Sequence, residues 1–280
     1  MKISVVIPVY NEAKVILECL ISLSKQTYQD FEVIVVDDGS KDKSKAKFLE
    51  AKKYFTKQKL ILTGQDHKGP AMARNLGASM AQGEILVFVD ADMTFDRRFL
   101  FELCEPIIKG EVKGTTSHEE YVGNWQNPWA RMWNFNQGKK TDSLQQKREK
   151  EDKVFRAIMM SEFKRVSGFD RGGYTDDYSL SSKLGYKAKV VKGARFYHEN
   201  PASLKETFLQ ARWASKREYK LGKLGALLAL IRFSLPMTII LGLRGIVRYR
   251  EPKFFLFKLV YNTASALGIL EYHLLGKGMK

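Results

Sequence analysis

The first hundred residues alternate short apolar runs with longer segments of helical periodicity. The apolar runs are four to seven residues long and lie at residues 3–9, 31–36, 60–63 and 84–89. Short runs between helices of ten or more residues are typical of a parallel, doubly wound sheet with helices on both faces. We therefore expect an α/β fold in which Asn11 caps the first helix and ligands bind beyond the carboxyl ends of the strands.

Composition excludes several other classes of protein. The chain of 280 residues is 44% hydrophobic and 28% charged, which is ordinary for a folded globular protein and excludes disordered, collagenous and coiled-coil chains. Cys19 and Cys104 are far apart and form no metal-binding spacing. A cysteine zinc site and a disulfide framework are therefore not expected. The protein is expected in a reducing compartment. The first residues lack the features of a signal peptide, so none is expected.

Acidic side chains follow two of the predicted strands at their carboxyl ends. Asp90 and Asp92 come after the strand at 84–89, and Asp37 and Asp38 come after the strand at 31–36. Carboxylate oxygens suit hard divalent cations such as Mg²⁺ or Mn²⁺, and an acid at a strand end can also bind a ribose hydroxyl. Acids of this kind are common in turns as well, so each pair taken alone leaves both interpretations open.

Four motifs in this order resemble those of the family 2 glycosyltransferases, and the match extends over residues 1 to about 200. The motifs are Ile7-Pro8-Val9-Tyr10-Asn11-Glu12, Val36-Asp37-Asp38-Gly39-Ser40, Lys68-Gly69 with Ala73-Arg74-Asn75 and Gly77, and Asp90-Ala91-Asp92. The resemblance implies a GT-A fold and an enzyme that inverts configuration at the sugar carbon. It also implies a nucleotide-diphosphate sugar as donor, with a UDP-sugar favoured over a GDP-sugar. No GxGxxG or Walker pattern is present, which weakens the dehydrogenase and ATPase alternatives.

The resemblance also implies roles for individual residues. A bound Mn²⁺ or Mg²⁺ is expected at Asp92, and His198, which ends a late strand, is a second candidate for a metal or diphosphate contact. The residues that it places around the nucleotide are Pro8, Tyr10, Glu12, Asp37, Asp38, Arg74 and Asp90.

The catalytic base is expected in the second half of the chain. Gly168-Phe169-Asp170 followed by Thr175-Asp176-Asp177 is similar to the family's GFD motif and acidic pair, which places the base at Asp177. Asp176 stands where the family usually has Glu, so its supporting role is in doubt. A carboxylate can accept the proton that a hydroxyl acceptor loses as it attacks. The alternative is that both acids only begin the next helix, where the helix dipole favours them.

Two further groups of residues are candidates for contacts with the diphosphate and with the acceptor. Arg212, Lys216 and Arg217 have helical spacing and could neutralise a leaving diphosphate, or could form a basic stripe that faces a membrane. Trp125, Trp129 and Trp133 recur every four residues, which is more often a packing stripe than a sugar platform.

The last eighty residues differ from the rest. Residues 201–280 hold 14 Lys or Arg against 4 Asp or Glu, and segments 224–243 and 254–275 are strongly apolar. Basic clusters flank the first apolar segment on both sides, which argues against a simple crossing. We expect helices that lie in the interface of an anionic membrane. The alternatives are a packed helical subdomain and true membrane spans.

These observations together predict a domain order and a function. Residues 1–202 are expected to form the GT-A catalytic domain, with a nucleotide-binding half at 1–110 and an acceptor-binding half at 111–202, and residues 203–280 a helical membrane-associating extension. The predicted enzyme is a metal-dependent glycosyltransferase at the cytoplasmic face of the cell membrane, acting on a lipid-linked glycan or polyprenyl phosphate. Nucleic acid is not expected as a partner, because the basic residues are not interleaved with exposed aromatics. The alternatives are a nucleotidyltransferase and a non-catalytic membrane-surface module.

Overall fold

The computed structural model describes residues 1–143, 149–170 and 178–275. The chain divides into two compact units. Unit 1 is drawn from residues 1–121 and 145–198, and unit 2 from residues 122–144 and 199–280. This division differs from the boundary expected at residue 202. Helix α5 (Pro128–Asn136) belongs to unit 2 because its aromatic side chains pack with those of the long C-terminal helix.

Unit 1 is built on an eight-stranded sheet with the strand order β3-β2-β1-β4-β9-β6-β10-β8. The bounds are β1 Ile3–Val9, β2 Phe31–Asp37, β3 Lys59–Gly64, β4 Ile85–Phe88, β6 Gly114–Ser117, β8 Glu151–Asp152, β9 Ala157–Met159 and β10 Ala188–Val191. The first four strands in this order are parallel, whereas β9 runs antiparallel to both of its neighbours. A smaller sheet has the order β5-β11-β7, with bounds Met93–Phe95, Phe196–His198 and Glu120–Val122. The expected α/β fold is confirmed.

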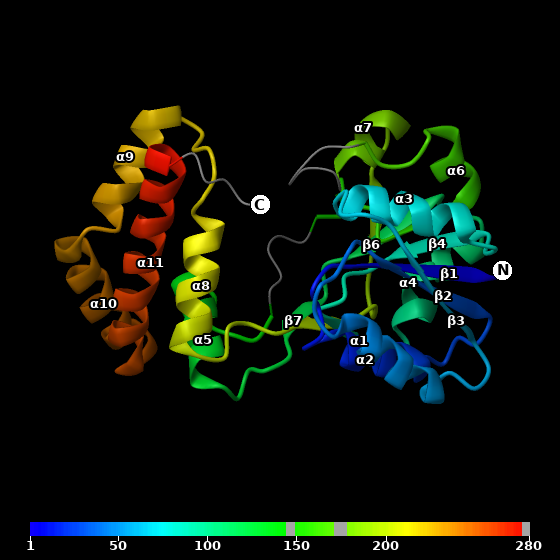
Figure 1. Cartoon of the computed structure of the whole chain (residues 1–280), viewed down its shortest axis with the longest axis horizontal. Coiled ribbons are helices and arrows are strands. Elements are labelled where there is room, and N and C mark those ends of the chain that lie inside the picture. The colour runs from blue at the N-terminus through cyan, green and yellow to red at the C-terminus, as the bar shows by residue number, and fades with distance from the viewer. Residues whose placement is uncertain (144–148, 171–177, 276–280) are drawn as a thin grey trace. The chain divides into compact units, whose positions relative to one another are not determined.

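Helices cover both faces of the large sheet (Figure 1). Alternate residues of β1 point to opposite faces, so Val5 and Ile7 enter one buried cluster and Val6 enters the other. The first cluster includes side chains of α1 (Ile16–Ser24), α2 (Ser44–Ala51) and α4 (Phe99–Ile108). The second includes side chains of α3 (Pro70–Met80), α6 (Met160–Arg165) and α7 (Ser179–Leu184).

Helix α3 lies close to the sheet because of Gly77. A Cβ atom at this position would overlap the Val6 side chain and come within 3.1 Å of the Val36 side chain. We expect Gly77→Ala to lower the free energy of unfolding by about 1–3 kcal/mol, because the added methyl group overpacks the core. Urea unfolding would measure this loss, with Ser79→Ala on the exposed side of the same helix as the control. A Gly77→Ala protein as stable as the control would contradict the close packing.

The expected start of the first helix was wrong. Helix α1 begins at Ile16, and Asn11 has a left-handed backbone with φ 59°. Its side chain accepts a hydrogen bond from the Lys41 backbone N–H at 2.8 Å, and its own backbone N–H donates to Ser40 Oγ at 3.0 Å. Asn11 therefore joins the loop after β1 to the loop after β2 and does not cap a helix.

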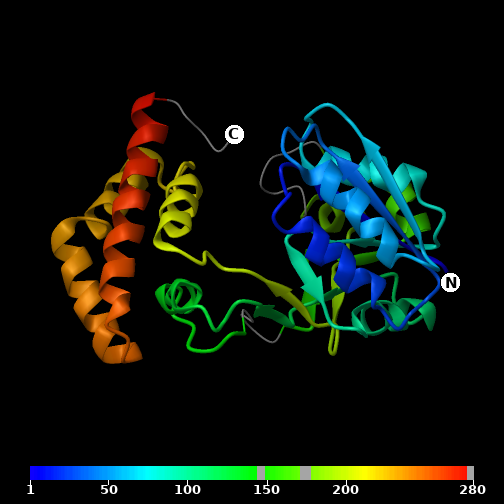
Figure 2. The same ribbon diagram turned by 60° about the horizontal axis from the view of Figure 1, so that its bottom comes forward.

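Unit 2 is helical. Its helices are α5, α8 (Leu204–Ala214), α9 (Gly222–Arg232), α10 (Leu235–Tyr249) and α11 (Lys253–Leu275). The apolar segment expected at 224–243 is broken between α9 and α10, where Pro236 can occupy only the first turn of a new helix. Figures 1 and 2 both show α11 between α8 and α10. Among the described residues, most of the large apolar side chains that remain exposed belong to unit 2.

Length and composition single out one helix of the described chain as able to cross a membrane, α11 over Lys253–Leu274. Helices α9 and α10 pass the same test only as a pair, and they are bent by 57° at their junction. In α11, 44% of the apolar window is buried against other parts of the protein. Core helices of soluble proteins also pass such a test, so these features alone do not define a span.

Candidate active site

The predicted acidic residues meet at one edge of the sheet in unit 1. Strand β1 lies between β2 and β4 and is parallel to both, with Val9 opposite Asp37. Residues that follow the three strands therefore lie at the same edge, as expected for a ligand site of an open α/β sheet. These residues are Tyr10, Glu12, Asp37, Asp38, Asp90 and Asp92.

The Asp38 side chain holds the loop that follows β3 through hydrogen bonds. The residue is only 2% exposed, and its Oδ1 accepts hydrogen bonds from Gln65 Nε2 at 2.7 Å and from the Lys68 backbone N–H at 2.8 Å. Its Oδ2 accepts from the Gly69 backbone N–H at 2.9 Å and lies 2.9 Å from His67 Nδ1. Both carboxylate oxygens thus have partners within the protein, so Asp38 shapes this wall of the site.

An aromatic pair stands beside that loop. The rings of Tyr10 and His67 are stacked with centroids 4.0 Å apart and an interplanar angle of 24°. Pro8, two residues before Tyr10, is the β1 residue paired with Val36. His67 belongs to no motif of the sequence and was therefore not predicted. A pocket of about 570 Å³ opens beside the loop that follows β3, and its lining includes Asp37, Gln65 and Lys68.

Arg74 and Asp90 form an ion pair inside the site. Arg74 Nη2 lies 2.8 Å from Asp90 Oδ1, and Arg156 Nη1 lies 4.0 Å from Asp90 Oδ2. Burial raises the pKa of the Asp90 carboxyl, but the two arginines outweigh it and hold that pKa below its usual value. Asp90 is therefore ionised and holds two cationic groups at the edge of the sheet. Arg156 was not predicted, because it precedes β9 without any recognisable motif.

The GFD motif is attached to α3 through Asn75. Asn75 Nδ2 donates to the Phe169 carbonyl at 2.9 Å, and the Phe169 backbone N–H donates to Asn75 Oδ1 at 2.9 Å. The Arg74 guanidinium lies over the Phe169 ring, 5.7 Å from its centroid. The GFD segment, the first part of the predicted catalytic motif, is thus held next to the Arg74–Asp90 pair. Asp176 and Asp177, the predicted base and its neighbour, lie outside the described residues.

Asp92 and His198 are brought together by the small sheet. Strand β11 pairs antiparallel with β5 so that His198 lies opposite Met93. His198 Nε2 is 3.5 Å from Asp92 Oδ1, and His198 Nδ1 is 2.5 Å from Glu120 Oε1. Burial lowers the pKa of His198, but hydrogen bonds to Asp92 and Glu120 outweigh it and raise the pKa to about 9. Glu120 was missed because it lies far from both partners in the sequence.

The site accumulates negative charge around Glu12. Burial of the Glu12 carboxyl, together with the nearby charges of Asp92, Asp42 and Asp90, raises its pKa to about 7. Within the described ranges, no three acidic, histidine or cysteine side chains converge as a ready-made metal site. An Mg²⁺ or Mn²⁺ ion usually takes only one or two carboxylates from the protein and completes its coordination with water and substrate phosphates. Asp92, flanked by His198 and close to Glu12 and Asp90, fits such a cation.

The predicted basic and aromatic groups of unit 2 have structural partners. Arg212 forms an ion pair with Glu271, and Lys216 Nζ lies 2.6 Å from the other oxygen of that carboxylate. The Arg217 guanidinium lies 5.7 Å from the centre of the Tyr219 ring. Arg212 in α8 and Lys216 just after it therefore join this part of the chain to α11, and their role at a diphosphate stays a prediction.

The tryptophans of the 125–133 stripe pack against other aromatic residues. Trp129 and Trp133 border the buried cluster of Met132, Phe254 and Phe257, and Trp133 lies 5.5 Å from Tyr261 between ring centroids. Trp125 is placed edge to face with Phe135 at 6.0 Å. Trp129 and Trp133 thus pack as a helical stripe would, and the acceptor platform stays a prediction.

The fold and the site define an α/β protein with a group of acidic side chains at the carboxyl edge of its main sheet. Residues 4–166 match the family model described as Glycosyl transferase family 2, which covers more than half of the chain. The chain belongs to this family.

Individual relatives support the same assignment. Glycosyltransferase GlyG of Streptococcus pneumoniae is 42% identical over 125 residues, covering 45% of this chain and 39% of the relative. The poly(ribitol-phosphate) beta-glucosyltransferase of Bacillus spizizenii is 44% identical over 94 residues, covering 33% of this chain and 15% of the relative. The chain thus spans less than half the length of these curated relatives.

Solved structures share the fold. S. aureus TarS in complex with UDP-GlcNAc superposes with a TM-score of 0.57 at 18% identity, covering 99% of this chain and 93% of the other. Mannosyltransferase PcManGT from Pyrobaculum calidifontis, in complex with GDP-Man and Mn²⁺, superposes with a TM-score of 0.58 at 18% identity, covering 99% of this chain and 88% of the other.

Proposed function

We propose that the protein transfers a sugar from a UDP-sugar, with inversion and with the aid of Mn²⁺ or Mg²⁺, to an acceptor held at a membrane. The observation that carries this proposal is the group of Glu12, Asp90 and Asp92 beside His198 at the carboxyl edge of the sheet. UDP-GlcNAc in the TarS structure favours a UDP-sugar, while GDP-Man and Mn²⁺ in PcManGT keep a GDP-sugar as the second candidate.

Each residue of the site has its own role in the proposed reaction. Asp38 and the loop at 64–69 form the wall near the base, and Tyr10 and His67 supply aromatic surface there. Asp90 holds Arg74 and Arg156, whose charges face the same edge as the acids. A divalent cation bound at Asp92 would offset the negative charge that builds on the leaving diphosphate. Asp177 accepts the proton of a hydroxyl acceptor.

The acceptor side of the proposal rests on unit 2. Exposed leucine, isoleucine and valine side chains on α9, α10 and α11 lie among basic residues, a combination typical of helices that bind anionic membrane surfaces. We infer a lipid-linked glycan or a polyprenyl phosphate as acceptor, at the cytoplasmic face of the membrane. Flotation of the full chain with anionic vesicles tests this part, and a chain that floats equally poorly with anionic and neutral vesicles contradicts it.

A product assay tests the reaction class. The chain is incubated with UDP-GlcNAc, UDP-glucose or GDP-mannose, each with Mn²⁺, Mg²⁺ or EDTA, and with polyprenyl phosphate in detergent micelles. We expect release of the nucleoside diphosphate with one donor, faster with the acceptor and absent in EDTA. Release of pyrophosphate would identify a nucleotidyltransferase, and no release with any donor would contradict the proposal.

A further inference from the structure

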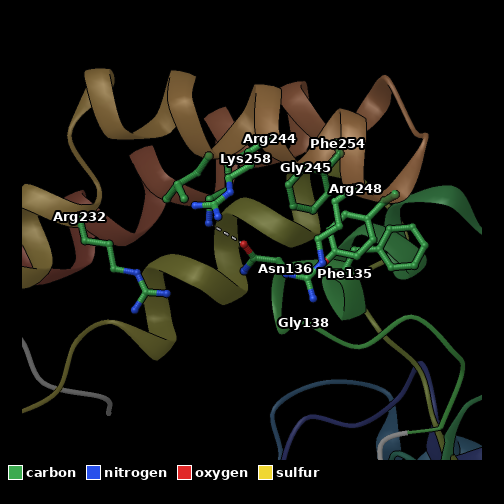
Figure 3. Close-up of a pocket in the computed structure, with 11 residues that line it drawn as sticks. Phe135, Asn136, Gly138, Arg232, Arg244, Gly245, Arg248, Phe254 and Lys258 are labelled. Atoms are coloured by element: carbon green, nitrogen blue, oxygen red, sulfur yellow. Dashed lines mark hydrogen bonds between the residues drawn. The ribbon is translucent and has the colours of Figure 1, made fainter.

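A cationic pocket lies in unit 2, apart from any residue assigned to the reaction. It has a volume of about 290 Å³, near the lower end of ligand pockets, which are roughly 300–1,000 Å³. Its described lining includes four basic side chains and no acidic one: Arg232 from α9, Arg244 and Arg248 from α10, and Lys258 from α11. Figure 3 shows Arg244, Arg248 and Lys258 near Asn136 of α5, with Arg232 further to the left.

No carboxylate of the described residues lines this pocket. Within the described part of the chain, none of the four basic side chains forms an ion pair with an acidic residue. The Lys258 residue is only 7% exposed, and its Nζ donates to Asn136 Oδ1 at 2.6 Å (Figure 3). Burial and the charge of Arg232 lower the pKa of Lys258 to about 8. The other contact of this ammonium is the Tyr261 ring, whose centroid lies 5.5 Å from Nζ. A buried ammonium with a cationic neighbour and no carboxylate partner among the described residues is costly, and a bound anion would offset that cost.

The pocket borders an exposed apolar surface. Ile240, Arg244 and Arg248 follow one another at four-residue spacing and so form one row along α10. The adjacent row holds Leu243 and Val247, which are 54% and 81% exposed. A molecule with a phosphate next to alkyl chains would match both surfaces at once, and guanidinium groups bind phosphate oxygens through paired hydrogen bonds.

We propose that this pocket binds the phosphate headgroup of an anionic membrane lipid, with Arg244, Arg248 and Lys258 as its ligands. The proposal rests on the membrane association proposed above and assigns it to particular residues. The lipid phosphate lies against α10 and α11, and its alkyl chains cover the apolar row of Leu243 and Val247.

Vesicle binding by charge-matched variants tests this site. The double variant Arg244→Gln/Arg248→Gln removes two pocket charges, and Lys220→Gln/Lys223→Gln removes two exposed charges of the same unit outside the pocket. Binding is measured with phosphatidylcholine vesicles that contain phosphatidic acid. We expect the pocket variant to lose at least about tenfold more affinity for the vesicles than the control variant. If only the general attraction between basic residues and the membrane mattered, the loss of two charges would weaken both variants equally. Equal losses would overturn the proposal.

Two further arms identify the ligand and separate this site from the donor site. Inorganic phosphate and a short-chain phosphatidic acid are titrated by calorimetry, and inorganic phosphate binding as tightly as the lipid would overturn the assignment to a lipid. Single-stranded DNA that competes fully with the vesicles would overturn it also. UDP binding in the presence of Mn²⁺ is measured on the same variants and should be unchanged. A wild-type chain that does not bind UDP would instead contradict the proposed function.

Lys258→Met provides a second test that does not depend on vesicles. Below pH 8, Lys258 is charged in both the folded and the unfolded chain, so the folded chain bears the whole cost of the buried charge. Between pH 8 and the usual lysine pKa of 10.5, the unfolded chain binds more protons, and wild-type stability rises with pH. Lys258→Met should therefore melt at a higher temperature than the wild type at pH 7, by a margin that shrinks toward pH 10.5. A lower melting temperature at pH 7 would show that the amine serves the fold and would overturn its role as a ligand.

Discussion

Asp92→Asn is expected to reduce kcat by about 10²- to 10⁴-fold, because a bound metal contributes several kcal/mol to stabilising charge in the transition state. The substitution keeps the shape of the side chain, which is 54% exposed, and removes its charge. Fold and nucleotide affinity in EDTA should therefore change little. Steady-state kinetics at several Mn²⁺ concentrations measure the effect.

The kinetic control for this variant is Asp30→Asn. Asp30 is an exposed acid that precedes β2, at the end of the strand away from the site. It should leave kcat within about twofold of the wild type, since surface substitutions away from the chemistry are usually neutral. An Asp92→Asn enzyme with wild-type kcat and an unchanged metal requirement would show that the cation binds elsewhere.

Asp177→Asn is expected to separate two kinds of acceptor. A hydroxyl must lose a proton as it attacks the sugar carbon, and loss of a general base typically costs 10²- to 10⁴-fold. A phosphate acceptor is already ionised near neutral pH and does not need a strong base. The variant should therefore be severely impaired with a hydroxyl acceptor and mildly impaired with polyprenyl phosphate.

The comparison requires both acceptor types with one donor, and transfer is followed by release of the nucleoside diphosphate. Asp176→Asn is the matched control, because Asp176 is the neighbouring acid whose supporting role the sequence leaves in doubt. Equal and severe losses of the Asp177→Asn enzyme with both acceptors would contradict the distinction. In that case Asp177 would serve the structure of the site and not proton transfer.

Much of unit 1 could be predicted because its signals are local. Strands such as Ile3–Val9 and Phe31–Asp37 are buried on both faces, so each appears as a continuous apolar run in the sequence. Parallel pairing then places Asp38 and Asp90 at one edge without any knowledge of side-chain contacts. The helix start at Asn11 was wrong because a polar residue after a strand can serve a loop as well as a cap, and only tertiary contacts with Ser40 and Lys41 decide between them.

The residues that the sequence did not reveal act across long separations. Glu120 reaches His198 only because β11 lies in the small sheet beside β5 and β7, and Arg156 reaches Asp90 only because β9 inserts next to β4. In unit 2, Arg212 and Lys216 have a spacing suited to an anion, yet their partner is Glu271, about sixty residues further along the chain. Helical spacing indicates which side chains share a face but not what that face contacts.

The central claim is a donor site in which Asp92 and a divalent cation act together. Its most direct test is the thermal stability of the wild type and of Asp92→Asn with UDP, GDP, CDP and dTDP, each in Mn²⁺, Mg²⁺ or EDTA. A ligand at about 100 times its Kd adds roughly 2.7 kcal/mol to stability, which such a measurement detects readily. We predict a metal-dependent shift with UDP that is lost in Asp92→Asn. Shifts of equal size in EDTA and in the variant would contradict the claim.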